Sequence, residues 1–239
     1  SKGYNINLGD NMAGCVVVDG TSAGTSPASV SNFVLNPQLA TLSLNQSGND
    51  VIVGSTAIYL DGTNGIDTND GSSAANAVKT FARAKQRLID TGGDVIIVIG
   101  AALINNTGEL SNWDLSEKPN AVILRGLGYT GHLVHVPNGY SLTLSNITFD
   151  GNKENVALST TNSIIYNNYG TLTINAGTTI RNNYYYGVYS YYGSMYMNGG
   201  TISNNNNYGV YCYSSTSRLD EFVMTGGTIT ENTSYGVYS

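Results

Sequence analysis

MYMNGGTISNNNNYGVYC, residues 195–212, is the stretch that decides the fold, because most of it occurs three times in the chain. It returns as VMTGGTITENTSYGVYS at 223–239 and more loosely as LTINAGTTIRNNYYYGVYS at 172–190. Repeats of this length are typical of solenoids, in which one unit cannot bury its own apolar face and must stack on its neighbours. The sequence therefore predicts a series of stacked coils.

Aligning these copies with a weaker one before them gives three apolar columns and one asparagine column. The first apolar column contains Phe149, Ile180, Ile202 and Ile229. The second contains Leu144, Ile174, Met197 and Met224, and the third contains Leu142, Leu172, Met195 and Phe222. The asparagine column contains Asn152, Asn183, Asn205 and Asn232. We expect each column to run along the stack, one residue per coil.

Short alternating runs such as 172–174 and 187–190 lie between these columns and are broken by Asn-Gly, Gly-Gly or Asn-Asn. This pattern is typical of brief strands joined by turns. Successive side chains of a strand point to opposite faces, so Val188, Val210 and Val237 are expected inside the coils. The same alternation places on the outside Tyr189, Tyr211 and Tyr238.

The recurring G-G-T-I-x-x-N pattern, at 199–205 and 226–232, resembles the right-handed parallel β-helices of the pectin-lyase-like superfamily. The resemblance covers residues 142–239. It implies coils of three short strands, with stacked asparagine side chains hydrogen-bonding one another in the turns. It implies a fold and no particular activity.

Residues 57–100 predict a strand, a polar loop, a helix and a second strand. The helix is indicated by apolar residues on one face and by Gly92-Gly93 at its end. These apolar residues are Val78, Phe81, Ala82, Leu88 and Ile89. The block resembles the opening of many secreted bacterial β-helix proteins, through Tyr59, Asp61, Gly62, Gly65, Asp67, Gly71, Ser72, Lys79, Thr80, Phe81 and Ala84. The resemblance implies that the helix covers the N-terminal end of the solenoid, whose strand edges and core would otherwise be exposed.

The fold class expected is therefore all-β, a right-handed parallel β-helix with an N-terminal capping helix and a small preceding β-rich segment. We assign 57–239 to the solenoid, which is expected to be truncated at its C-terminus because the last strand motif ends the chain. Residues 1–56 contain no copy of the repeat and are interpreted as a β-rich N-terminal module or cap.

Acidic and amide residues crowd the loop from Asp61 to Asp70, where their oxygen atoms have the chemistry that Ca²⁺ prefers. The order lacks the EF-hand pattern, because Gly65 stands where a ligand belongs. Asp and Asn also form turns by binding nearby backbone amides, and the turn interpretation is favoured over calcium. No other cofactor is predicted.

Charged residues make up only 11% of the chain, whereas glycine (29) and tyrosine (18) are abundant. A surface of Asn, Thr, Ser and Tyr suits a secreted or cell-surface β protein of bacteria, so an extracellular location is expected. The net charge of −6, without a Lys/Arg cluster, argues against nucleic acid and anionic membranes as partners. No apolar run approaches the roughly 20 residues of a membrane span, so no membrane insertion is predicted.

Two cysteines, Cys15 and Cys212, are too few to predict a disulfide framework. Cys212 occupies the position that Ser190 and Ser239 fill in the neighbouring copies, which favours a small inward side chain over a reactive thiol. His132 and His135 lack a cysteine or a clear acidic partner, so the sequence favours turn or surface histidines over a zinc site.

Polysaccharide lyases and hydrolases of this superfamily imply calcium-binding acids with a base, or paired carboxylates. Residues 142–239 offer few such groups. The acids are Asp150, Glu154, Asp220, Glu221 and Glu231, and the bases are Lys153, Arg181 and Arg218. Asp150 and Arg181 share a column one coil apart, and an exposed ion pair is favoured over a catalytic role. No catalytic or metal residue is predicted.

The candidate binding residues are the outward tyrosines Tyr189, Tyr211 and Tyr238, together with Tyr196. Tyrosine combines a flat ring with a hydrogen-bonding tip, which suits sugars and protein partners. Stacked tyrosines also stabilise sheets, so a structural role remains an alternative. The insertion at 213–221 adds Arg218, Asp220 and Glu221 as candidate recognition residues.

These features favour a non-catalytic bacterial cell-surface adhesin that recognises a host glycoprotein, a glycan or an immune protein through a rigid β-helix. The first alternative is a polysaccharide lyase or glycoside hydrolase, and the second is a structural spacer or stalk.

Overall fold

The computed structural model describes residues 57–105, 108–157, 162–214 and 222–239, together with four short strands in the N-terminal part. These strands are β1 (Asn5–Asn7), β2 (Val17–Asp19), β3 (Leu42–Ser47) and β4 (Asp50–Ser55). They form one antiparallel sheet in the order β1-β2-β4-β3. The strand that begins at Ala57 pairs with none of them and opens a different architecture.

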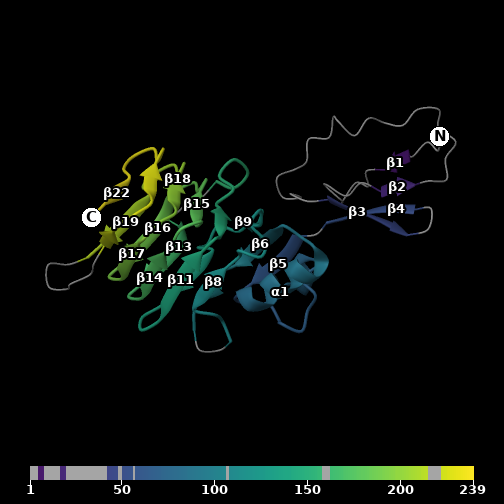
Figure 1. The fold of residues 1–239 in the computed structure, drawn as a ribbon, viewed down its shortest axis with the longest axis horizontal. Coiled ribbons are helices and arrows are strands. Elements are labelled where there is room, and N and C mark those ends of the chain that lie inside the picture. Colours follow the sequence, from purple (N-terminus) through teal and green to yellow (C-terminus); the bar gives the residue numbers. More distant parts are fainter. Residues whose placement is uncertain are drawn as a thin grey trace.

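From Ala57 onward the chain forms a parallel β-helix built from three sheets (Figure 1). The first sheet contains β5 (Ala57–Asp61), β6 (Val95–Gly100), β9 (Val122–Arg125), β12 (Thr148–Asp150), β15 (Thr179–Arg181), β18 (Thr201–Ser203) and β21 (Thr228–Thr230). The second contains β7 (Ala102–Leu103), β10 (Val134–Val136), β13 (Ser163–Asn168), β16 (Tyr186–Tyr191), β19 (Val210–Tyr213) and β22 (Val237–Tyr238). The third contains β8 (Asn112–Asp114), β11 (Ser141–Ser145), β14 (Thr171–Ile174), β17 (Ser194–Met197) and β20 (Phe222–Met224).

The chain visits the three sheets in this order in every coil. Strands β6, β7 and β8 make the first coil, and β18, β19 and β20 make the fifth. The coils stack from β5 and the helix α1 at one end to β22 at the other (Figure 1). The predicted all-β fold class, a parallel β-helix with an N-terminal helix, is confirmed.

The strand register confirms the columns that the repeats predict. Ile180 pairs with Phe149 on one side and with Ile202 on the other, and Ile202 pairs with Ile229. The other two apolar columns pair in the same way across β11, β14, β17 and β20. Alternation within each strand turns these residues inward, so one continuous apolar core runs through the coils as far as Met197, Ile202 and Val210. Phe222 and Ile229 of the next coil are partly buried against it.

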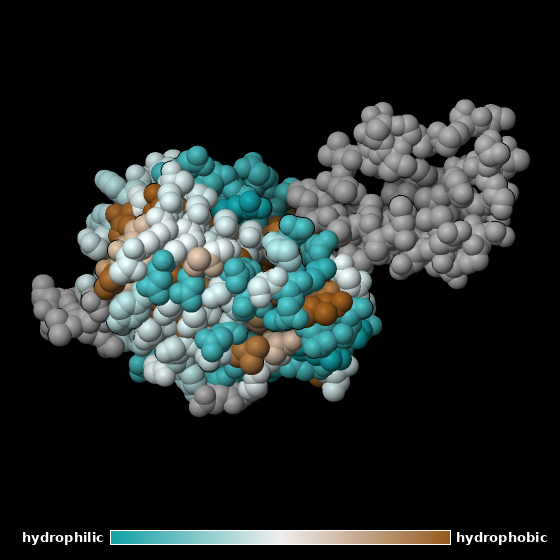
Figure 2. Space-filling view, in the orientation of Figure 1, coloured by the Kyte–Doolittle hydropathy of each residue, from teal (hydrophilic) through white to brown (hydrophobic). Residues whose placement is uncertain are grey.

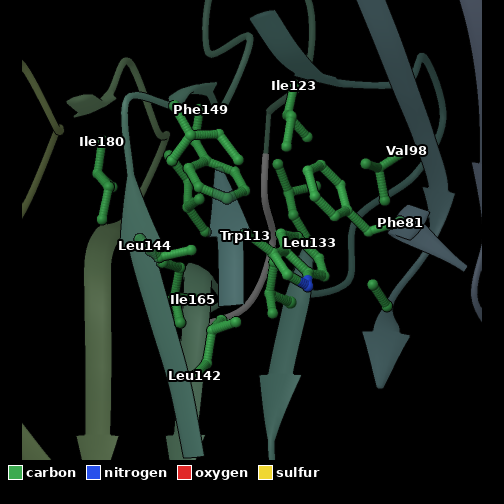
Figure 3. Close-up of a cluster of buried hydrophobic side chains, with 14 of the residues drawn as sticks. Phe81, Val98, Trp113, Ile123, Leu133, Leu142, Leu144, Phe149, Ile165 and Ile180 are labelled. Atoms are coloured by element: carbon green, nitrogen blue, oxygen red, sulfur yellow. The ribbon is translucent and has the colours of Figure 1, made fainter. Parts of the chain in front are cut away.

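The N-terminal half of this core contains three large aromatic side chains in one stack (Figure 3). Phe81 lies 4.1 Å from Trp113, and Trp113 lies 6.3 Å from Phe149, measured between ring centroids. Trp113 comes from β8, and its side chain is 1% exposed and belongs to the core, although the residues around it are polar.

The helix α1 (Phe81–Thr91) covers the first coil, as predicted, and follows a short 3-10 turn, η2 (Ala74–Asn76). Thr80 caps its N-terminus by accepting a hydrogen bond from the backbone N–H of Arg83, and Gly92 ends it in the left-handed conformation (φ 71°). Its buried residues are Phe81, Ala84 and Leu88. Val78, which the sequence placed on the helix, is buried just before it.

The asparagine column lies in the turn between the first and second sheets. The side-chain oxygen of Asn205 accepts the backbone N–H of Asn183 (3.0 Å), and that of Asn232 accepts the backbone N–H of Asn205 (3.1 Å). Asn152 is buried beside them but donates to the carbonyl of Arg125 (3.0 Å). The predicted stacking of asparagines in the turns is therefore confirmed for the last three members.

Candidate functional site

The outer face of the second sheet carries a column of tyrosines, one in each of four consecutive coils. Tyr166, Tyr189, Tyr211 and Tyr238 pair in register across β13, β16, β19 and β22. The ring centroids are 5.3, 5.0 and 5.5 Å apart along this row. The valines and small residues between the tyrosines point into the core, so alternation alone fixes the outward direction of the rings.

Further tyrosines flank this central row on both sides. On one side Tyr186 stacks on Tyr208 at 5.2 Å, and Tyr208 lies 5.6 Å from Tyr235. On the other side Tyr191 stacks on Tyr213 at 5.3 Å. We call the central row and these two flanks the tyrosine surface, with members Tyr166, Tyr186, Tyr189, Tyr191, Tyr208, Tyr211, Tyr213, Tyr235 and Tyr238.

Several rings of this surface stack on the ring of the next coil along the solenoid. The planes of Tyr189 and Tyr211 differ by only 9°, and those of Tyr186 and Tyr208 by 10°. Two parallel rings cannot lie side by side in one plane at centroid separations near 5 Å, so they overlap in the offset arrangement that aromatic pairs prefer. In these two pairs each ring therefore covers part of the face of its neighbour, and its edge and hydroxyl remain for other contacts. Tyr211 and Tyr238, at the end of the central row, are instead tilted by 57°.

The tyrosine surface is electrically neutral. Burial raises the pKa of Tyr189 to about 12, and the adjacent Tyr211 adds to the effect. The pKa of Tyr186 is also raised by burial and by its phenol neighbours. Strands β10, β13, β16, β19 and β22 contain no Asp, Glu, Lys or Arg. The phenols of Tyr186 and Tyr189 are therefore uncharged hydrogen-bonding groups at neutral pH.

Two histidines continue the aromatic row toward the N-terminal end. His135 pairs in register with Tyr166 and lies 5.1 Å from its ring, and His132 stacks on the same ring at 4.6 Å. His132 Nδ1 accepts the backbone N–H of Ser163 (3.0 Å), and burial lowers its pKa to about 4. His132 lies in the bend just before β10 and is partly buried, which agrees with the predicted turn position, whereas His135 lies within β10.

The structure separates the four predicted tyrosines into two groups. Tyr189, Tyr211 and Tyr238 lie together in the central row. Tyr196 lies in β17, on the outer face of the third sheet, and is not part of the tyrosine surface. Arg218, Asp220 and Glu221 lie outside the described residues. Their role in recognition stays a prediction.

Tyr166 is the member of the central row that the repeats did not reveal. Its strand reads SIIYNN and lacks the YGVYS sequence of the later copies. Alternation of apolar and polar residues is the sequence signal that could have found Tyr166. In the register of β13 and β16, Ile165, Tyr166 and Asn167 lie beside Val188, Tyr189 and Ser190.

A groove of about 320 Å³ on the first sheet gathers the residues of the catalytic alternative. Asp150 and Arg181 form the predicted ion pair, with Arg181 Nε donating to Asp150 Oδ2 at 3.1 Å. Asn182 donates to the same oxygen (2.8 Å), and Lys153 is bound to Asn204 (2.7 Å to its carbonyl). These contacts favour structural roles for the charged groups, and the catalytic alternative stays a prediction.

In the loop 61–70 the carboxylates bind backbone amides. Asp61 Oδ1 accepts the N–H groups of Thr63 and Asn64 (2.9 Å each), and Asp70 Oδ1 accepts that of Ser72 (2.9 Å). Asp67 Oδ1 accepts the N–H groups of residues 79 and 80. Among the residues that the structure describes, no three His, Cys, Asp or Glu side chains are grouped for a metal ion. Turn formation accounts for these geometries, and a calcium site here stays a prediction.

Cys212 pairs in register with Ser190, the position that the repeats predicted. Burial raises the pKa of its thiol to about 11, so the thiolate that reacts or binds metals is disfavoured. Cys15 lies outside the described residues.

Comparison with protein-family models, with curated proteins and with solved structures found no match to this chain. The protein is therefore classed by its fold alone, as a parallel β-helix with tyrosines covering one sheet. None of the helices in the described part of the chain has the length and apolar character needed to cross a membrane.

Proposed function

We propose that this protein is a non-catalytic binding protein that recognises a glycan, a host glycoprotein or an immune protein through the tyrosine surface. We place it with the secreted or cell-surface β-helix proteins of bacteria that resemble the pectin-lyase-like superfamily. The observation that carries the proposal is the alignment of Tyr166, Tyr189, Tyr211 and Tyr238 on one face of the second sheet.

Two further features support binding over a purely structural ladder. Aromatic rings can stabilise a sheet through a single column of cross-strand pairs, whereas here three rows lie side by side. Tyr189 and Tyr211, which have a coil stacked on either side, also remain partly exposed to solvent. Tyrosine is enriched at binding interfaces because it adds contact area and a hydrogen-bonding tip at low conformational cost.

Replacing Tyr189, Tyr211 and Tyr238 together by serine tests this proposal. The core should persist, because Val188 and Val210 remain inward, and circular dichroism should show a folded β protein. Binding to an array of glycans, mucins and host proteins should be lost. The control is Tyr196→Ser, which removes an outward tyrosine from a different sheet and should leave binding unchanged.

Three results would contradict the proposal. Undiminished binding by the triple variant would place recognition elsewhere on the molecule. Silence of the wild-type protein on the whole array would favour the spacer alternative. Release of unsaturated sugar ends from an acidic polysaccharide on addition of Ca²⁺, lost in Arg181→Ala, would favour the lyase alternative.

A further inference from the structure

We propose that the tyrosine surface takes an uncharged polysaccharide chain, which lies along the solenoid axis and is held by phenol hydroxyls and ring edges. This inference rests on the proposed function and names the class of its ligand. It also changes the expected mode of contact, because sugars would not stack on the ring faces of the central row.

The mode of contact follows from the ring geometry. Tyr189 has neighbours in the row on both sides, with Tyr166 at 5.3 Å and Tyr211 at 5.0 Å. Both of its faces are therefore engaged within the protein. A sugar ring that stacked on Tyr189 would have to displace one of these neighbours. The outward part that remains is the ring edge, which carries partial positive charge, and the phenol hydroxyl, which both donates and accepts hydrogen bonds.

The lack of charge selects an uncharged ligand. An acidic polysaccharide or a nucleic acid needs Lys or Arg to replace its counterions, and the strands beneath the tyrosine surface contain neither. The pKa of His135, at the end of the row, is lowered by burial, so this side chain adds no positive charge at neutral pH. Sugar hydroxyls match phenol hydroxyls because each group can donate and accept.

The periodicity selects a polymer. Equivalent tyrosines repeat once per coil, at the spacing of about 4.8 Å between neighbouring strands of a sheet. The same group therefore recurs in a straight row over four coils, from Tyr166 to Tyr238. A chain of identical units can make the same hydrogen bond repeatedly along such a row. A folded protein presents no matching repeat and relies instead on a few anchors that enter pockets.

The test uses calorimetric titration of the full chain with defined polysaccharides. The neutral probes are soluble mixed-linkage β-glucan, galactomannan and dextran. The acidic probes are polygalacturonate and hyaluronate, and a mucin serves as the protein-borne probe. The key variant is Tyr189→Phe with Tyr211→Phe, which removes two hydroxyls and keeps the ring stack. Tyr196→Phe on the third sheet is the matched control.

Four results are expected. At least one neutral polysaccharide binds, and its affinity stays constant over roughly a tenfold range of ionic strength. Oligosaccharides of that polymer bind more tightly as they lengthen, until they span the central row. The double Phe variant melts at the wild-type temperature and binds about tenfold or more weakly, as expected for the loss of buried hydrogen bonds. Tyr196→Phe binds like the wild type.

Tyrosine-dependent binding that is confined to acidic polysaccharides or to the mucin would overturn this inference and leave the proposed function intact. Undiminished binding of a neutral polymer by the double Phe variant would also overturn it, because the hydroxyls would then play no part. If no probe shows tyrosine-dependent binding, either in the calorimetric titrations or on the array, both this inference and the proposed function are overturned.

Discussion

Asn205 illustrates how single residues join one coil to the next. Its side chain is fully buried, and its oxygen accepts the backbone N–H of Asn183 in the preceding coil. Its amide nitrogen donates to Asn232 Oδ1 in the following coil (2.9 Å). One buried side chain thus pairs polar groups of the coils on both sides of it.

Replacing Asn205 by alanine should lower the free energy of unfolding by about 1–3 kcal/mol, because the buried N–H of Asn183 loses its acceptor. Asn198→Ala is the matched control. Asn198 donates to Asn175 Oδ1 (3.1 Å) in an exposed ladder, so water can replace that contact at a cost of no more than about 0.5 kcal/mol. Chemical denaturation measures both variants. Equal stability of the two would contradict a structural role for the buried ladder.

Arg125 is the residue whose role was least apparent from the sequence. Its guanidinium is fully buried and donates to the carbonyls of Gly151 (3.2 Å), Gly131 and Ser163 (3.4 Å) and to Asn183 Oδ1 (3.0 Å). Burial lowers the pKa of Arg125 to about 10, which leaves it charged at neutral pH. Arg125 thus connects Asn183 of the asparagine column with an earlier coil. The residues involved lie far apart in the sequence, so no local pattern indicates this arrangement.

The helix α1 is the element that ends the solenoid, and a carboxylate from a distant turn secures its first residues. Glu109 Oε2 accepts the backbone N–H of Phe81 at 2.7 Å. Burial raises the pKa of Glu109 to about 7, although the hydrogen bonds that the carboxylate accepts from backbone N–H groups lower it. The charged carboxylate is thus disfavoured in the folded protein relative to the unfolded chain.

This raised pKa predicts a loss of stability as the pH rises. The unfolded chain releases the Glu109 proton near pH 4.5, whereas the folded protein retains it to about pH 7. The stabilisation is therefore complete below the unfolded pKa and is lost as the pH rises through the folded pKa. Between roughly pH 5 and 8 the wild type should lose on the order of 2 kcal/mol relative to Glu109→Gln.

Urea denaturation at several pH values measures this difference. Glu117→Gln is the control, because Glu117 is 63% exposed in its pair with Lys85 and lies away from the helix N-terminus. This variant should follow the pH dependence of the wild type. A Glu109→Gln protein that does the same would contradict the assignment.

Across the whole molecule, the sequence predicted the features that recur in successive repeats and missed the features that occur in only one coil. The columns through Ile202 and Tyr211 were predictable because near-identical copies must adopt the same register. Trp113 was not, because its coil has no recognisable copy and the polar residues around it indicate a loop. The overlap of the tyrosine rings was also beyond the sequence, since alternation gives the side of a sheet and not the orientation of a ring.

The outer faces of the first and second sheets of the solenoid differ in chemical character. Figure 2 shows the hydrophobic colours on the visible face of the solenoid as small separate patches among pale and hydrophilic residues. The charged residues of β12 and β15, Asp150 and Arg181, lie on the first sheet, whereas the second sheet presents uncharged phenols. This arrangement favours ligand recognition by the second sheet and a structural role for the ion pair on the first sheet.

Fluorine NMR of the protein labelled with 3-fluorotyrosine tests most directly whether the tyrosine surface is the binding site. The protein is titrated with the polysaccharide that binds most tightly, and resonances are assigned with single Tyr→Phe variants. The resonances of Tyr189 and Tyr211 should shift with the Kd that calorimetry gives, while those of Tyr59 and Tyr196 stay in place. Saturable binding that moves Tyr59 or Tyr196 and leaves Tyr189 and Tyr211 unchanged would contradict this assignment.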